Sequence, residues 1–201
     1  MLEPRPSTLV PKFKSNVILE FAHIPKCAGS SIIHTLWERN PLLGKNFISW
    51  ATRIRQKRKS WYPNKFLFAF VRNPYDRLVS AYFHIRGVHP REWLDINIKN
   101  DGESCKGIHE FVDHNLSSNI WSDFHLHPQH YFIPEGADFI GKYENLHEDF
   151  EKLKKIVGIK DDVKLLSLNR RRYPKISFTE KQKNIIYEVY QKDFELFGYE
   201  K

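Results

Sequence analysis

Apolar runs and helical stripes alternate along the first half of the chain. An apolar run over 17–21 predicts a buried strand, and apolar residues at helical spacing over 32–37 predict a helix after it. A second apolar run over 66–71 is typical of a strand covered on both faces. An apolar stripe over 75–83 predicts the helix that follows it. The chain therefore begins with two strand–turn–helix units.

The second half of the chain continues this pattern. Residues 138–141 predict a third strand, and the stretches 106–115 and 146–157 predict amphipathic helices. We expect the last helix to begin at a capping box formed by Thr179 and Gln182. Strands that alternate with helices predict an α/β fold with three layers around a central parallel sheet.

The turn between the first strand and the first helix combines the features of an anion site. It reads His23-Ile24-Pro25-Lys26-Cys27-Ala28-Gly29-Ser30-Ser31. The first N–H groups of a helix can face an anion, and Gly29 lets the backbone approach an oxyanion closely. Lys26 supplies a mobile positive charge, while Ser30 and Ser31 can cap the helix and donate to a phosphate. The alternative for this stretch alone is a capped helix without a ligand.

This turn differs in sequence from two other phosphate loops. A Walker A loop ends in Gly-Lys-Ser/Thr, whereas here Lys26 precedes Gly29. A phosphatase loop has an Arg six residues after its Cys, and Ile33 stands at that place after Cys27. The turn is therefore P-loop-like in its position after a strand but not in its residues.

A second polar segment follows the second strand. It reads Arg72-Asn73-Pro74-Tyr75-Asp76-Arg77-Leu78-Val79-Ser80. Pro74 suits the first position of a helix, and it places Asn73 where an N-cap belongs. Arg72 therefore stands at the C-terminal end of a strand, where ligands bind in open parallel sheets. Two such units with anion donors at the same sheet edge predict one ligand with two separated phosphate groups.

Together the two segments resemble the nucleotide-binding signatures of sulfotransferases that use 3′-phosphoadenosine 5′-phosphosulfate (PAPS). Residues 142–146 and 193–199 are similar to further segments of the carbohydrate sulfotransferases of Golgi type and their small bacterial relatives. The resemblance covers nearly the whole chain beyond the first fifteen residues. We therefore expect a flexible N-terminal segment over 1–15 and a single sulfotransferase domain over 16–201, with a P-loop-like nucleotide-binding turn.

The resemblance implies transfer of a sulfuryl group from PAPS to a hydroxyl, with a carbohydrate as the expected acceptor. The loop 25–31 would hold the 5′-phosphosulfate, with Lys26 neutralising charge on the leaving phosphate. Arg72 and Ser80 would hold the 3′-phosphate. The basic loop 169–173 would fold over the nucleotide, and its candidate contact is Arg172, with Arg170 and Arg171 as alternatives. No metal is required, because the cations of the protein neutralise the charge.

The acceptor hydroxyl needs a general base. His23 lies next to the loop and is the candidate, although a His that ends a buried strand is often a structural hydrogen-bonder. Its rivals are His84, Glu103, His114, His125, His127 and His130. The irregular stretch 117–134 holds the last three of these with several aromatic residues. Loop packing and acceptor contact, the latter through Gln129 and Tyr131, are favoured over a zinc site there.

Composition restricts the partners and the compartment. The 201 residues carry a net charge of +8, which favours a polyanionic partner such as a nucleotide or an acidic polysaccharide. Cys27 and Cys105 are the two cysteines, so we expect no disulfide framework and a reducing compartment. We see no signal peptide and no apolar run of about 18 residues, and we expect a cytoplasmic protein without a transmembrane segment.

Two other classes of function stay open at this point. A P-loop-like nucleotide kinase would show ATP turnover with magnesium, although the Walker A sequence is missing. A non-catalytic basic module that binds polyanions would use the basic stretch 49–59, which we expect to be helical. Relatives often carry a His near the start of that helix, where this chain has Trp50. We expect no nucleic-acid partner for the sulfotransferase.

Overall fold

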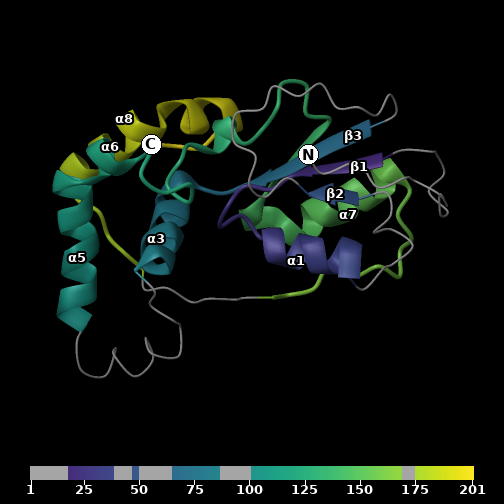
Figure 1. Cartoon of the computed structure of the whole chain (residues 1–201), viewed down its shortest axis with the longest axis horizontal. Helices are drawn as coiled ribbons and strands as arrows, with labels where there is room; N and C mark the ends of the chain where they lie inside the picture. The colour runs from purple at the N-terminus through teal and green to yellow at the C-terminus, as the bar shows by residue number, and fades with distance from the viewer. Residues whose placement is uncertain (1–17, 39–46, 50–64, 87–100, 169–174) are drawn as a thin grey trace, which may run out of the picture. The chain divides into compact units, whose positions relative to one another are not determined.

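The chain divides into two compact units in the computed structural model, and Figure 1 shows their strands and helices. The residues described are 18–38, 47–49, 65–86, 101–168 and 175–201. The sheet unit comprises the described parts of 1–71 and 132–169, and the helical unit comprises those of 72–131 and 170–201. Each unit is described by itself below. The expectation of a single domain over 16–201 stays a prediction.

The sheet unit is built on four parallel strands. They are β1 (Ile18–Ala22), β2 (Phe47–Ser49), β3 (Lys65–Val71) and β4 (Phe139–Lys142), and their order in the sheet is β2-β1-β3-β4. Three of these strands were predicted, and the parallel sheet is confirmed. The prediction missed β2, and it was wrong to begin a basic helix at Ser49, which lies in β2. The rest of that stretch, including Trp50, lies outside the described residues.

Two helices pack against the sheet within this unit. Helix α1 (Gly29–Ile33) continues as a π-helical turn, η1 (His34–Glu38), and α7 (Leu146–Val157) ends at Gly158 with a left-handed C-cap. Alternate residues of β1 and β3 join the helices in one buried cluster, which includes Leu19, Phe21, Ile32, Leu36, Phe68, Phe70, Phe150, Leu153 and Val157. The α/β class with a central parallel sheet flanked by helices is therefore confirmed.

The helical unit contains α3 (Pro74–Ile85), α5 (Asp101–His114), α6 (Leu116–Asn119) and α8 (Glu180–Phe197). Its buried core draws on all four, and includes Leu78, Phe83, Ile108, Val112, Leu116, Ile186, Tyr190 and Phe194. The predicted helix over 106–115 begins earlier than expected, at Asp101.

Both predicted helix starts in this unit are confirmed. The side chain of Asn73 accepts hydrogen bonds from the N–H groups of Tyr75 and Asp76. Thr179 and Gln182 form a reciprocal capping box at the start of α8. These local caps fix the first residue of the helix that follows each basic segment.

Candidate functional site

The loop between β1 and α1 has an unusual backbone. Lys26 has a φ of 70° and Ala28 has a φ of 65°, so two residues other than glycine occupy the left-handed region. Cys27 lies between them, and its buried thiol reaches the carbonyl of Pro25 at 3.7 Å. Such conformations cost free energy and persist where the surrounding structure imposes them, commonly at ligand sites. The anion-site prediction thus falls on a strained turn.

Helix α1 begins without a side-chain cap. Its N-cap is Ala28, whose methyl side chain cannot accept a hydrogen bond from the first amides of the helix. The expectation that Ser30 or Ser31 caps the helix is wrong, because the helix starts at Gly29 and both serines are already inside its first turn. A helix start without a cap is compatible with amide groups that serve a ligand.

The hydroxyl of Ser31 is engaged by the chain 137 residues further on. It donates to the carbonyl of Leu168 at 3.3 Å and accepts from the N–H of the same residue at 3.1 Å. One helical turn later, Thr35 accepts from the N–H of Leu166 at 2.9 Å. These contacts attach the segment 166–168 to α1. That segment leads into the basic loop with Arg172, which lies outside the described residues.

His23 packs against the loop. Its ring stacks on Phe21 with 5.7 Å between ring centroids. Its Nε2 edge occupies the space that a methyl group on Gly29 would need. A side chain at position 29 would therefore push the His23 ring aside, a packing constraint that sequence reasoning did not anticipate.

Gly29→Ala is expected to lower the free energy of unfolding by about 1–3 kcal/mol, because the new methyl group overlaps the imidazole of His23. His23→Ala removes that obstacle, so the double variant should lose less free energy of unfolding than the two single variants lose together. Urea unfolding of the three variants measures this coupling. Two strictly additive effects would show that the ring and the glycine do not constrain each other.

Arg72 is held through its backbone. Its N–H donates to Gln129 Oε1 at 2.8 Å, and Gln129 Nε2 donates to the carbonyl of Arg72 at 2.8 Å. Gln129 lies in the short 3₁₀ turn η2 (Gln129–Tyr131) and is fully buried. The sequence suggested that Gln129 contacts the acceptor, but its side chain instead fixes the segment that follows β3.

Asp193 of α8 holds the same turn from the other side. One carboxylate oxygen accepts from the N–H of Gln129 at 2.6 Å. The other accepts from the N–H of His130 at 3.0 Å and lies 2.7 Å from His130 Nδ1. Asp193 is fully buried, so these contacts compensate a carboxylate removed from water.

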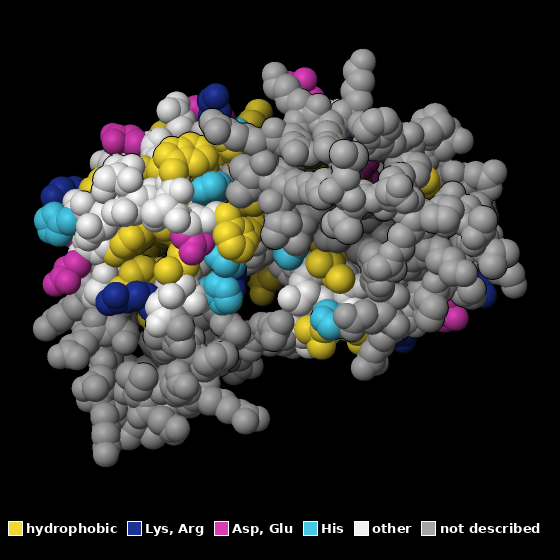
Figure 2. All heavy atoms as spheres, viewed as in Figure 1, with side chains coloured by type: hydrophobic (Ala, Val, Ile, Leu, Met, Phe, Trp, Pro, Cys, Tyr) yellow, Lys and Arg dark blue, Asp and Glu magenta, His cyan; other side chains and the backbone are white. Residues whose placement is uncertain are grey.

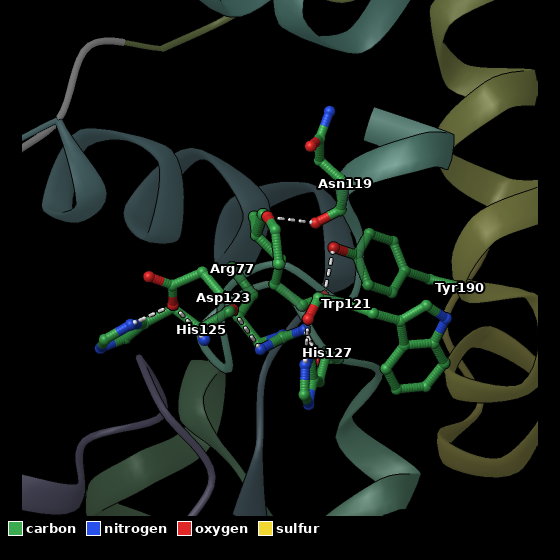
Figure 3. A network of polar contacts seen from close by, with 9 residues as sticks. Arg77, Asn119, Trp121, Asp123, His125, His127 and Tyr190 are labelled. Carbon is green, nitrogen blue, oxygen red and sulfur yellow. Dashed lines mark hydrogen bonds and ion pairs between the residues drawn. The ribbon is translucent and has the colours of Figure 1, made fainter. Parts of the chain in front are cut away.

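Arg77 is a buried cation in the core of the helical unit. Only 1 % of its surface is exposed, and its guanidinium donates to the carbonyls of His125 at 3.0 Å and His127 at 2.5 Å (Figure 3). It also faces the ring of Tyr190 at 5.5 Å, and the hydroxyl of Tyr190 donates to Leu126 at 2.7 Å. Burial raises the pKa of Tyr190 above its ordinary value. Three successive carbonyls are thus held by two buried side chains.

The three histidines of this stretch have different surroundings. His125 Nδ1 lies 2.8 Å from Asp123 Oδ1, and its ring is 4.4 Å from that of His84. Burial alone would raise the pKa of Asp123, but hydrogen bonds from the backbone and ring of His125 hold it below its ordinary value. His127 packs on Trp121, and His130 bonds to Asp193 as described above. Among the residues described, no group of three metal-ligating side chains is placed to hold a metal ion.

The remaining predicted residues are divided between the units. Pro25 to Ala28 lie in the loop of the sheet unit and Gly29 to Ser31 begin α1, while Arg72 and Ser80 belong to the helical unit. Arg72 is partly buried, and Ser80 is buried on α3 between exposed Asp76 and partly buried His84.

Within the described ranges, no helix is long and apolar enough to cross a membrane.

Comparison with family models identifies the group of proteins to which the chain belongs. A family model described as the sulfotransferase family matches residues 14–200. The chain therefore belongs to the sulfotransferase family and is a transferase. Comparisons with curated proteins and with solved structures found no match.

Proposed function

We propose that the protein transfers the sulfuryl group of PAPS to a hydroxyl of a carbohydrate. The observation that carries this proposal is the strained turn at Lys26 and Ala28, followed by a helix whose N-cap, Ala28, supplies no side-chain hydrogen bond to the first amides. Membership of the sulfotransferase family supports the sulfuryl transfer itself. The family's usual donor and the Arg72 segment support PAPS.

The proposed chemistry uses the chain's own cations. The acceptor oxygen attacks sulfur, the bond from sulfur to the 5′-phosphate oxygen breaks, and adenosine 3′,5′-bisphosphate leaves. Lys26 and the backbone of 27–31 stabilise the negative charge that grows on the departing phosphate. Arg72, Ser80 and Arg172 bind the 3′-phosphate, with the charge-assisted hydrogen bonds that phosphates favour. Positioning and charge stabilisation supply the catalysis, as in phosphoryl transfer, without a required metal.

His23 is our candidate for the general base that takes the acceptor's proton. Its ring touches the loop at Gly29, so it lies beside the residues proposed to hold the phosphosulfate. Its stacking on Phe21 would fix the ring's orientation, which a catalytic base requires. We place the reaction in a reducing compartment, the cytoplasm, because the sequence has two cysteines and one of them, Cys27, lies in the loop proposed to hold the phosphosulfate.

Exposed aromatic rings support a saccharide acceptor. Trp121 is 52 % exposed and Tyr131 is 40 % exposed, with 4.7 Å between their ring centroids. Phe124 is also exposed, and Figure 2 shows hydrophobic and histidine side chains beside each other near the helices that Figure 1 labels α6 and α8. Aromatic faces with nearby polar groups provide both the stacking and the hydrogen bonds that orient a ligand such as a sugar.

Titration calorimetry with adenosine 3′,5′-bisphosphate, AMP and ATP tests the donor site. We expect the bisphosphate to bind more tightly than either control, because only it places a phosphate on Arg72. Arg72→Ala should raise the dissociation constant of the bisphosphate by about tenfold to a hundredfold and leave that of AMP nearly unchanged.

Equal affinity for the bisphosphate and AMP would contradict the proposed donor. ATP turnover with magnesium would favour a nucleotide kinase instead. Strongly salt-dependent binding of polyanions without nucleotide affinity would favour a non-catalytic basic module.

A further inference from the structure

The backbone of Arg72 is fixed at two points by one side chain. The amide of Gln129 accepts from its N–H and donates to its carbonyl, each at 2.8 Å. A two-point contact of this kind restrains the rotation of both peptide groups that flank Arg72. It therefore sets the direction in which the side chain of Arg72 leaves the backbone.

Gln129 can do this only if its own position is fixed. Asp193 accepts from its N–H at 2.6 Å and from the N–H of the next residue, His130, at 3.0 Å. Both Gln129 and Asp193 are fully buried, so loss of either contact leaves polar groups unpaired in the core. The result is a connected path from α8 to the segment that follows β3.

The residues before Gln129 are fixed as well. Arg77 binds the carbonyls of His125 and His127, and Tyr190 binds the one between them, from Leu126. A turn held at this many successive positions has little freedom to shift. It can therefore hold the backbone of Arg72 in one position, so less conformational freedom is lost when the arginine binds a ligand.

We propose that Gln129 and Asp193 are positioning residues that orient Arg72 toward the 3′-phosphate of the donor. The inference rests on the proposed function, because it assumes that Arg72 binds that phosphate. Neither residue touches the nucleotide in this account. Their contribution is preorganisation, in which the supporting contacts hold a binding group in its productive geometry.

The test is a double-mutant cycle on nucleotide affinity. Dissociation constants for adenosine 3′,5′-bisphosphate and AMP are measured for the wild type, Gln129→Leu, Arg72→Ala and the double variant. We expect Gln129→Leu to weaken bisphosphate binding by about tenfold, since small displacements of a positioned group are costly. The affinity for AMP should stay within about twofold of the wild-type value. AMP has no 3′-phosphate, so a misplaced Arg72 leaves the contacts of AMP intact.

The double variant separates positioning from general damage. If Gln129 acts through Arg72, the double variant should bind the bisphosphate no more weakly than Arg72→Ala alone. Additive losses, or equal losses for the bisphosphate and AMP, would overturn the inference. A wild type that does not prefer the bisphosphate would instead refute the proposed function.

Two further variants keep the test decisive if Gln129→Leu does not fold. Gln129→Glu keeps the acceptor for the Arg72 N–H and loses the donor to its carbonyl, so a smaller loss of the same selectivity is expected. Asp193→Asn should also reduce the preference for the 3′-phosphate. The matched control is Asp149→Asn, a buried carboxylate of the sheet unit that binds the N–H of Lys142 at 2.8 Å. Equal selectivity losses in Asp149→Asn and Asp193→Asn would overturn the inference.

Discussion

Lys26→Ala is expected to lower sulfuryl transfer by about a hundredfold to a thousandfold, the usual cost of removing one group that stabilises transition-state charge. The reason is that Lys26 is the cation of the loop proposed to hold the phosphosulfate. Transfer from labelled PAPS to a mixture of saccharides measures the loss. The fold should stay intact, because Lys26 is only partly buried.

Three companion variants make this result specific. Lys26→Gln keeps most of the side chain and loses the charge, so it should be as inactive as the alanine variant. Lys26→Gly should also be inactive yet no less stable, because glycine adopts a φ of 70° without strain. The Lys152→Ala variant, which changes an exposed lysine of α7, should transfer the sulfuryl group at the normal rate. Near-normal turnover in Lys26→Gln would refute the assigned role.

Arg77→Ala is expected to lower the free energy of unfolding by about 3 kcal/mol or more, since hydrogen bonds from a charged group contribute about 1.5–3 kcal/mol each. The substitution leaves the carbonyls of His125 and His127 without this donor inside the core. It also opens a space next to the ring of Tyr190. Urea unfolding followed by circular dichroism measures the effect.

Arg86→Ala is the matched control for this prediction. Arg86 follows α3, is exposed, and faces the ring of Tyr82 at 5.8 Å, so it also contacts an aromatic ring. Its removal should change stability by less than about 1 kcal/mol, as is usual at the surface. Arg77→Lys should lie between the two, because an ammonium group lacks the planar fork of a guanidinium. An Arg77→Ala variant as stable as Arg86→Ala would contradict the structural role.

Most of the fold was readable from the sequence because its strands and helices carry their own signals. The apolar run before Arg72 became β3, and the capping box at Thr179 starts α8. β2 was missed because Phe47–Ser49 is too short to show a period. Its place in the sheet comes from pairing with β1, a long-range contact that local patterns do not encode.

The candidate site was predicted only at the level of its motifs. The sequence indicated the loop 25–31 and the segment from Arg72, because both follow apolar strands. It did not reveal the roles of Gln129 and Asp193, since their partners lie up to 64 residues away. One signal was present, because Asp193 falls on the apolar stripe of α8, where a carboxylate needs a partner.

The contact between His23 and Gly29 has a consequence for how the family can diverge. A side chain at position 29 would displace the ring of His23 from its present place, so the two positions are expected to change together among related sequences. A lineage that changes position 29 first passes through a less stable intermediate. Sequence change at the start of α1 is therefore limited by the packing of the His23 ring.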